Sequence, residues 1–316
     1  NKLNINFFYW TCSFFSLIIA IDILLHLYFG LNVFNIKSDP FFGFNSFFKE
    51  EKVAGGFMLF TLPFSIILFN DYFKKSKKNF IIETAIIFLM ISAIFISSNK
   101  MSFVMAVFFL FFITIIVKRF RFQTIIAILI FLLSTSFIFK KDKTIYDRYE
   151  SFFIHISSVT DETKDNIVES EFFTKKYSSS HGLIFMDSYE VFLEKKFIGG
   201  GIKSFRQNCP KLNKTNKNCS THPHNFVLEI LNDTGIIGLI LSIVFSLLLL
   251  RDCIYKILSD KIQKDKKEFY YILLCLLFLI FWPVKSTGSI FSTFSGSILW
   301  ISICILSFCT FKKTKN

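Results

Sequence analysis

The sequence predicts an all-α, polytopic membrane protein with about eight membrane-spanning helices. Hydrophobic residues make up 53% of the 316-residue chain, and they gather in separate blocks. Each block has about 17–23 residues, the length that a helix needs to cross ~30 Å of hydrocarbon. Short tracts rich in Lys and Arg separate many of the blocks, and such tracts mark the cytoplasmic ends of membrane helices. Block length and basic tracts together predict this fold class.

Five of the predicted helices precede residue 140 and three follow residue 230. In chain order they cover about 7–29, 53–70, 80–97, 102–117, 122–139, 231–250, 269–284 and 290–310. The first block opens the chain, and the basic KKSKK separates the second from the third. The block at 102–117 is the shortest, but the polar SSNKMS before it and the basic KRFR after it indicate a crossing. The last three follow a long polar segment.

One topology places all four basic tracts on the same side of the membrane. They are KKSKK at 74–78, KRFR at 118–121, KDKK at 264–267 and KKTK at 312–315. Both chain ends are then cytoplasmic, and the segment at 140–230 lies on the outer face. At about ninety residues it far exceeds an ordinary loop, so we expect it to be functional. The predicted organisation is transmembrane helices 1–5 at 1–139, a periplasmic loop domain with short helices at 140–230, and transmembrane helices 6–8 at 231–316.

The outer segment contains one clear helical pattern. Apolar residues recur near a helical period across 182–197, and the helix-stopping GGG follows at 199–201. Residues 206–221 are polar and contain Pro210, which predicts an irregular, lid-like loop.

Two cysteines, Cys209 and Cys219, lie in this polar stretch. In an oxidising periplasm they could close a disulfide. Zinc binding by both cysteines with His222 and His224 is the alternative, although the spacing matches no common zinc module.

His224 stands where the outer segment meets the next membrane helix. Imidazole has an ordinary pKa near 6.5, so His224 could act as a general base at neutral pH. An interfacial histidine that bonds a loop carbonyl is the other interpretation. His222, which is separated from His224 by Pro223, is interpreted as a supporting residue. The glycines of NDTGIIG, Gly235 and Gly238, are small enough to let neighbouring helices approach closely.

Four cations are predicted on the same outer face as the histidines: Lys203, Arg206, Arg148 and Lys100. Together they would suit a phosphate-bearing ligand, because Arg offers a bidentate fork and Lys a point charge. Taken one at a time, each is better interpreted as a solvated residue or a lipid-headgroup contact, the usual role of interfacial Lys and Arg.

The sequence lacks the signature motifs of several functional classes. The net charge of +13 lies in tracts beside membrane helices and forms no basic face with a recognition module, which argues against nucleic-acid binding. There is no Walker loop, no G-x-S-x-G elbow and no H-E-x-x-H. The outer segments hold no D-x-D pair to bind metal for a nucleotide-sugar transferase. We therefore expect no metal and no cofactor.

Two motifs carry a resemblance to a known family. GGGIKSFRQNCP at 199–210, followed by CSTHPHNFVLEILNDTGIIGLI at 219–240, resembles the O-antigen ligases of Gram-negative bacteria, which share a domain with O-antigen polymerases. The resemblance implies a GT-C-like architecture with more helices than this chain contains. Because the chain opens with Asn1 and shows no signal peptide, we expect it to be N-terminally incomplete.

The resemblance also implies an activity. Such proteins transfer a glycan from undecaprenyl diphosphate to an acceptor hydroxyl at the periplasmic face of the bacterial inner membrane, without metal. By resemblance, His224 is the catalytic residue. The residues expected to bind diphosphate or glycan are Arg206, Arg148, Lys203, Lys100, His181, His222 and Asn225. Lys100 and His181 stand where the family often has Arg, and Lys100 cannot bind phosphate through the bidentate fork of an Arg.

Three functions remain open from the sequence. The first is an O-antigen ligase with a lipid A–core acceptor. The second is an O-antigen or exopolysaccharide polymerase, or a protein O-oligosaccharyltransferase, which would use the same donor and a different acceptor. The third is a non-enzymatic polysaccharide transporter or flippase, but such proteins often contain internal repeats, and we find none.

Overall fold

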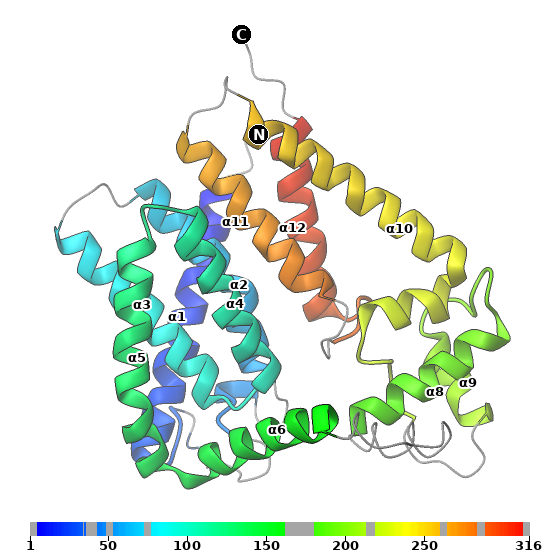
Figure 1. Ribbon diagram of the computed structural model, residues 1–316, viewed down its shortest axis with the longest axis horizontal. Helices are drawn as coiled ribbons and strands as arrows, with labels where there is room; N and C mark the ends of the chain where they lie inside the picture. Colours follow the sequence, from blue (N-terminus) through cyan, green and yellow to red (C-terminus); the bar gives the residue numbers. More distant parts are fainter. Residues whose placement is uncertain are drawn as a thin grey trace. The chain divides into compact units, whose positions relative to one another are not determined.

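The structure is a computed structural model that describes residues 5–33, 35, 43–48, 53–72, 77–161, 180–212, 219–259, 264–282 and 288–311. Within these residues it is helical and has no β-strand (Figure 1). A helix occupies each predicted membrane segment: α1 (Ile5–Phe29), α2 (Ala54–Tyr72), α3 (Lys77–Ile96), α4 (Lys100–Ile116), α5 (Arg121–Lys141), α10 (Phe226–Leu258), α11 (Lys264–Phe281) and α12 (Thr293–Phe311). The all-α prediction is confirmed.

Length and composition make α1, α3, α5 and α10 able to cross a membrane. Shorter apolar stretches occur in α2, α4 and α12, at Ala54–Phe69, Lys100–Ile116 and Gly296–Ile305. Many large apolar side chains on α5 and α10 are exposed, which is typical of helices that face lipid rather than water. The chain is therefore a polytopic membrane protein.

The remaining described elements are the short helix η1 (Ser46–Phe48) and three helices of the predicted outer segment, α6 (Lys143–Asp161), α8 (Ser180–Glu194) and α9 (Ser204–Leu212). The predicted helix at 182–197 corresponds to α8. The prediction of an irregular loop at 206–221 is wrong for its first seven residues, which belong to α9. Residues 213–218 lie outside the described part.

The chain divides into two compact units. The first comprises Asn1–Ser158 and Gln263–Leu279, and the second comprises Val159–Ile262 and Ile280–Asn316. In the first unit α3 packs against α1, α2, α4 and α5. In the second unit α10 packs against α8, α9 and α12. The predicted boundaries at residues 139 and 230 remain a prediction.

A buried ion pair joins α3 to the turn before α5. Arg119 Nη2 lies 2.8 Å from Glu83 Oε1 and also donates to the Phe69 carbonyl at 3.2 Å. Gln123 Nε2 donates to the second carboxylate oxygen, Oε2, at 3.0 Å. Because the Glu83 side chain is only 2% exposed, its charge depends on these partners.

Replacing Arg119 with Ala is expected to lower the free energy of unfolding by ~3–5 kcal/mol, because it leaves the Glu83 carboxylate buried without its counter-charge. Thermal unfolding of the purified protein in detergent measures the effect. The matched control is Arg251→Ala, which breaks an exposed pair with Asp252 and is expected to change stability by ~0–1 kcal/mol. Equal losses in the two variants would contradict a structural role for the buried pair.

Candidate functional site

The helix after the predicted histidine motif is broken near its start. Gly235, inside α10, has φ 68° and ψ −167°, which is not helical. The helix changes direction here, as Figure 1 shows for the segment labelled α10. A break inside a helix leaves backbone N–H and C=O groups without their usual partners, and these groups require new ones.

Residues 195–203, which we call the glycine turn, supply those partners. The Gly200 and Gly201 N–H groups donate to the carbonyls of Asn232 and Asp233 at 2.7 and 3.0 Å. In the other direction, the amides of Ile236 and Ile237 donate to the carbonyls of Lys196 and Phe197 at 2.8 and 3.2 Å. The glycine turn thus completes the hydrogen bonding of the broken helix.

Two glycines allow this close contact. A Cβ at Gly199 would lie 2.4 Å from the Asp233 carbonyl carbon, and a Cβ at Gly235 would lie 2.3 Å from the Phe197 oxygen. Both residues also have φ 68°, a left-handed conformation that favours glycine. Gly235 therefore allows the backbone of the glycine turn to approach α10. The sequence instead predicted that this glycine would allow the close approach of a neighbouring helix.

Gly235→Ala is expected to destabilise the protein more than Gly201→Ala. Gly201 also has positive φ, at 92°, but a Cβ there would meet no atom within 4 Å. Gly201→Ala should lower the free energy of unfolding by about 1–2 kcal/mol, the strain of a side chain in a left-handed conformation. Gly235→Ala should lower it further, because its Cβ would also clash with backbone atoms. The melting temperatures of the two purified variants check this, and equal shifts would contradict the interlocked arrangement.

The carboxylate of Asp233 caps the start of α9. Oδ2 accepts from the Lys203 N–H at 2.9 Å, and Oδ1 accepts from the Ser204 N–H at 3.0 Å. The Ser204 hydroxyl lies 3.1 Å from the same Oδ1 and 2.9 Å from the Asn232 carbonyl. An acidic group at a helix N-terminus accepts hydrogen bonds from the free N–H groups there, and its negative charge interacts favourably with the helix dipole. This cap, supplied by a residue distant in sequence, explains why α9 forms in a polar stretch.

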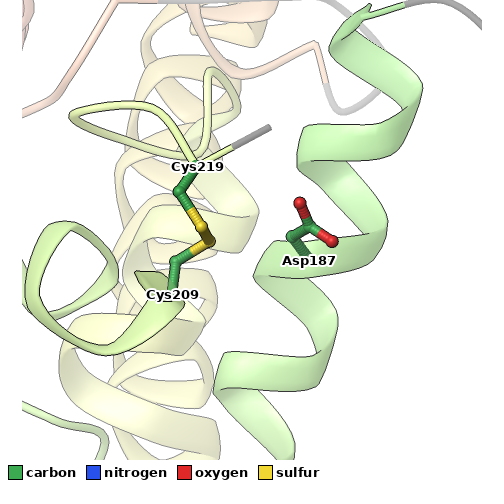
Figure 2. A group of neighbouring side chains, drawn as sticks. All are labelled: Asp187, Cys209 and Cys219. Atoms are coloured by element: carbon green, nitrogen blue, oxygen red, sulfur yellow. A yellow bond between two sulfur atoms is a disulfide. The ribbon is translucent and has the colours of Figure 1, made fainter. Parts of the chain in front are cut away.

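Cys209 and Cys219 are joined in a disulfide, with a Cα–Cα distance of 5.7 Å. The bond ties α9 to the segment that carries both histidines, and Figure 2 shows it beside Asp187 of α8. The ligand atoms of these three residues lie within 4.8 Å of one another. Zinc binds cysteine as a free thiolate, so the bonded cysteines cannot serve as its ligands. With the disulfide formed, the zinc set considered from the sequence lacks two of its four ligands.

His224 is held in an unusual backbone conformation next to the start of α10. Its φ is 54°, in the left-handed region, where non-glycine residues are uncommon. Ser220 Oγ lies 3.0 Å from its Nε2 atom, and the His222 ring centroid lies 4.1 Å from its own. Both rings are half-buried. Strained backbone of this kind clusters at functional sites and fixes side-chain direction.

Asn225 is the N-cap of α10. Its Oδ1 accepts from the amides of Val227 and Leu228 at 2.9 and 3.1 Å. The side chain is 5% exposed. Asn225 therefore fixes the point at which the His224 backbone enters the helix.

In the first unit, Lys100 lies against α6, the helix that carries Arg148. Lys100 Nζ lies 5.6 Å from the ring centroid of Phe152, one helical turn after Arg148. The neighbouring Tyr149 anchors α6, because its hydroxyl donates to the Phe95 carbonyl at 3.0 Å and its ring stacks on that of Phe95 at 4.4 Å. Burial raises the pKa of Tyr149, so the phenol stays neutral as a donor. These contacts fix α6 against the end of α3 and place Lys100 over a ring of the same helix.

A comparison with protein-family models matches residues 85–243 to the O-antigen ligase family. The match spans half of the 316 residues. The chain belongs to the O-antigen ligase family. The matched region runs from α3 into α10 and contains every residue predicted for the site. A search of curated proteins finds no match to this chain.

The predicted residues of this O-antigen ligase family member fall into both units. The first unit holds Lys100 and Arg148, and the second holds Lys203, Arg206, His181, His222, His224 and Asn225. Lys203 and Arg206 are exposed, before and within the first turn of α9. His181 is the second residue of α8, and its side chain lies outside the described part. Within the second unit, the Asp233 cap and the disulfide connect the cation-bearing α9 to the histidine segment.

The sequence interpretation of this family member missed two acidic residues of α10, Asp233 and Glu229. Glu229 is 2% exposed and accepts from the Ser289 hydroxyl and, at 2.7 Å, from the Ile290 N–H. It therefore attaches the segment before α12 to α10. Acidic residues inside a hydrophobic helix are rare enough to be a signal, and both could have been selected on that basis.

Proposed function

We propose that this chain is an O-antigen ligase that transfers a glycan from undecaprenyl diphosphate to a hydroxyl of lipid A–core. The reaction would take place at the periplasmic face of the bacterial inner membrane. The observation that carries the proposal is His224, which is held by Ser220 and by a left-handed backbone beside the Asn225 cap. The family membership supports the same class of reaction.

The chemistry needs a base and fixed positive charge. The acceptor hydroxyl loses its proton to His224 while its oxygen bonds to the anomeric carbon of the glycan. The bond from that carbon to the diphosphate breaks, and the electron pair leaves with undecaprenyl diphosphate. The donor is already activated by its diphosphate, so this step requires no nucleotide. A positioned general base contributes about 10²–10⁴-fold to such a step.

The cations would stabilise the charge that develops on the diphosphate. Arg206 and Lys203 are exposed at the capped end of α9, and the disulfide ties this helix to the histidine segment. We also assign Arg148 and Lys100, which belong to the first unit, to diphosphate binding. We assign His222 and His181 to glycan or diphosphate binding, and Asn225 to positioning of His224.

Lipopolysaccharide from a deletion strain, separated by electrophoresis and stained with silver, tests the acceptor. A ligase predicts core without any O-chain, together with carrier-linked polymer that accumulates in the inner membrane. Core that carries a single repeat unit would instead indicate a polymerase, and unchanged lipopolysaccharide would indicate a different acceptor. Re-expression of the full-length protein must restore the wild-type pattern.

A further inference from the structure

The glycine turn, residues 195–203, exposes an unusual amount of apolar surface for a turn. Phe197, Ile198 and Ile202 are 72%, 75% and 64% exposed. Lys195, Lys196 and Lys203 are exposed in the same turn. Large apolar side chains flanked by lysines are typical of segments that lie at a membrane surface.

The turn is fixed rather than free to fold its apolar side chains inward. Its backbone exchanges hydrogen bonds with Asn232 and Asp233 before the break in α10, and with Ile236 and Ile237 after it. Gly199 and Gly235 bring the two backbones together too closely for any Cβ. Phe197, Ile198 and Ile202 therefore belong to an ordered segment, and no described residue of the second unit buries them.

The same hydrogen bonds set the depth of the turn in the membrane. Ile236 and Ile237 begin the part of α10 whose apolar side chains are exposed along its length. These include Ile236, Ile237, Ile240, Leu241, Val244, Leu247 and Leu248. In a membrane protein, such a surface faces hydrocarbon. The glycine turn is hydrogen-bonded to Ile236 and Ile237, the first residues of this apolar part of α10. The turn therefore lies where the hydrocarbon layer begins.

We propose that the glycine turn is an interfacial membrane anchor. Phe197, Ile198 and Ile202 enter the outer edge of the hydrocarbon, and Lys195 and Lys196 contact anionic lipid phosphates. Charge complementarity supports a lipid surface as the occupant, because lysines beside an apolar patch match acidic headgroups. A protein partner that covers the patch would instead keep it away from lipid.

Depth-dependent fluorescence quenching of the full chain tests the proposal. Trp10, Trp282 and Trp300 are first replaced with Phe, and a single tryptophan is then introduced as Phe197→Trp or, separately, Ile202→Trp. The matched control is Gln207→Trp, at an exposed position of α9, a helix without an exposed large apolar side chain. Each variant is reconstituted into phosphatidylcholine vesicles containing phosphatidylglycerol. The phosphatidylcholine is brominated either near the headgroup end or near the methyl end of its acyl chains.

Bromine near the headgroup end is expected to quench the Phe197→Trp and Ile202→Trp indoles strongly, and bromine near the methyl end only weakly. The Gln207→Trp indole should be quenched by neither. Adding Lys195→Gln and Lys196→Gln should reduce quenching in vesicles rich in phosphatidylglycerol. Quenching no stronger than in the control would overturn the proposal, as would stronger quenching from the methyl end. Glycan transfer plays no part in this measurement, so its outcome is separate from that of the proposed reaction.

Discussion

Replacing His224 with Asn is expected to lower glycan transfer by ~10²–10⁴-fold, the usual contribution of a positioned general base. Asn is preferable to Ala here because Asn, like His, tolerates the left-handed backbone found at this position. The change therefore removes the imidazole with little added backbone strain. The measurement is the amount of O-chain joined to core in a deletion strain that expresses the variant at the wild-type level in its membranes.

His222→Asn is the control for this experiment. The two rings are neighbours, with centroids 4.1 Å apart, but only His224 is bonded to Ser220 and adjoins the cap of α10. We expect His222→Asn to retain much more activity than His224→Asn. Undiminished transfer in the His224 variant, or an equal loss in both, would contradict the assignment of the base.

Replacing Arg206 with Ala is expected to lower transfer by ~10²–10³-fold, the effect of removing one preorganised donor from a developing negative charge. Arg206→Lys should recover only part of this loss, because Lys keeps the charge but not the bidentate fork. Rates are measured on membranes that contain equal amounts of each variant. Full activity of Arg206→Lys would argue against bidentate binding of the diphosphate.

Lys211→Ala is the matched control on the same helix. Lys211 is exposed in the last turn of α9, where its Nζ lies 3.4 Å from Asn208 Oδ1. Its removal changes the net charge by the same amount as Arg206→Ala. If the two variants lose activity equally, general electrostatic attraction explains the effect better than a specific contact.

The membrane helices could be predicted because their signal is local. Each expected apolar block coincides with a helix, since a run of this length and hydropathy requires no distant partner to form one. The same applies to α8, whose period and terminating glycines lie in adjacent residues.

The helix α9 could not be predicted in the same way. Its cap comes from Asp233, and its buried face, which includes Phe205 and Cys209, packs on residues of α8. The break at Gly235 could not be predicted for a related reason. The glycine turn, which supplies the missing backbone hydrogen bonds, lies more than thirty residues earlier in the sequence. Gly235 stands inside an apolar run that favours a continuous helix, and an isolated glycine in such a run is no firm sign of a break.

The candidate site followed mainly from a motif. The His-Pro-His-Asn sequence identified His224, and the structure adds the Ser220 contact, the left-handed backbone and the Asn225 cap. The link from Asp233 to the first turn of α9 was absent from the sequence interpretation. It explains how α9, the helix that carries the exposed Arg206, is fixed against α10.

Transfer in a reconstituted system tests the central claim most directly. The full-length protein is placed in proteoliposomes with a glycan on undecaprenyl diphosphate and with lipid A–core as acceptor, and the products are analysed by mass spectrometry. We predict glycan joined to core with the wild-type protein, and almost none with His224→Asn at the same protein level. Longer carrier-linked glycan without any core-linked product, or equal core-linked product from both proteins, would contradict the account.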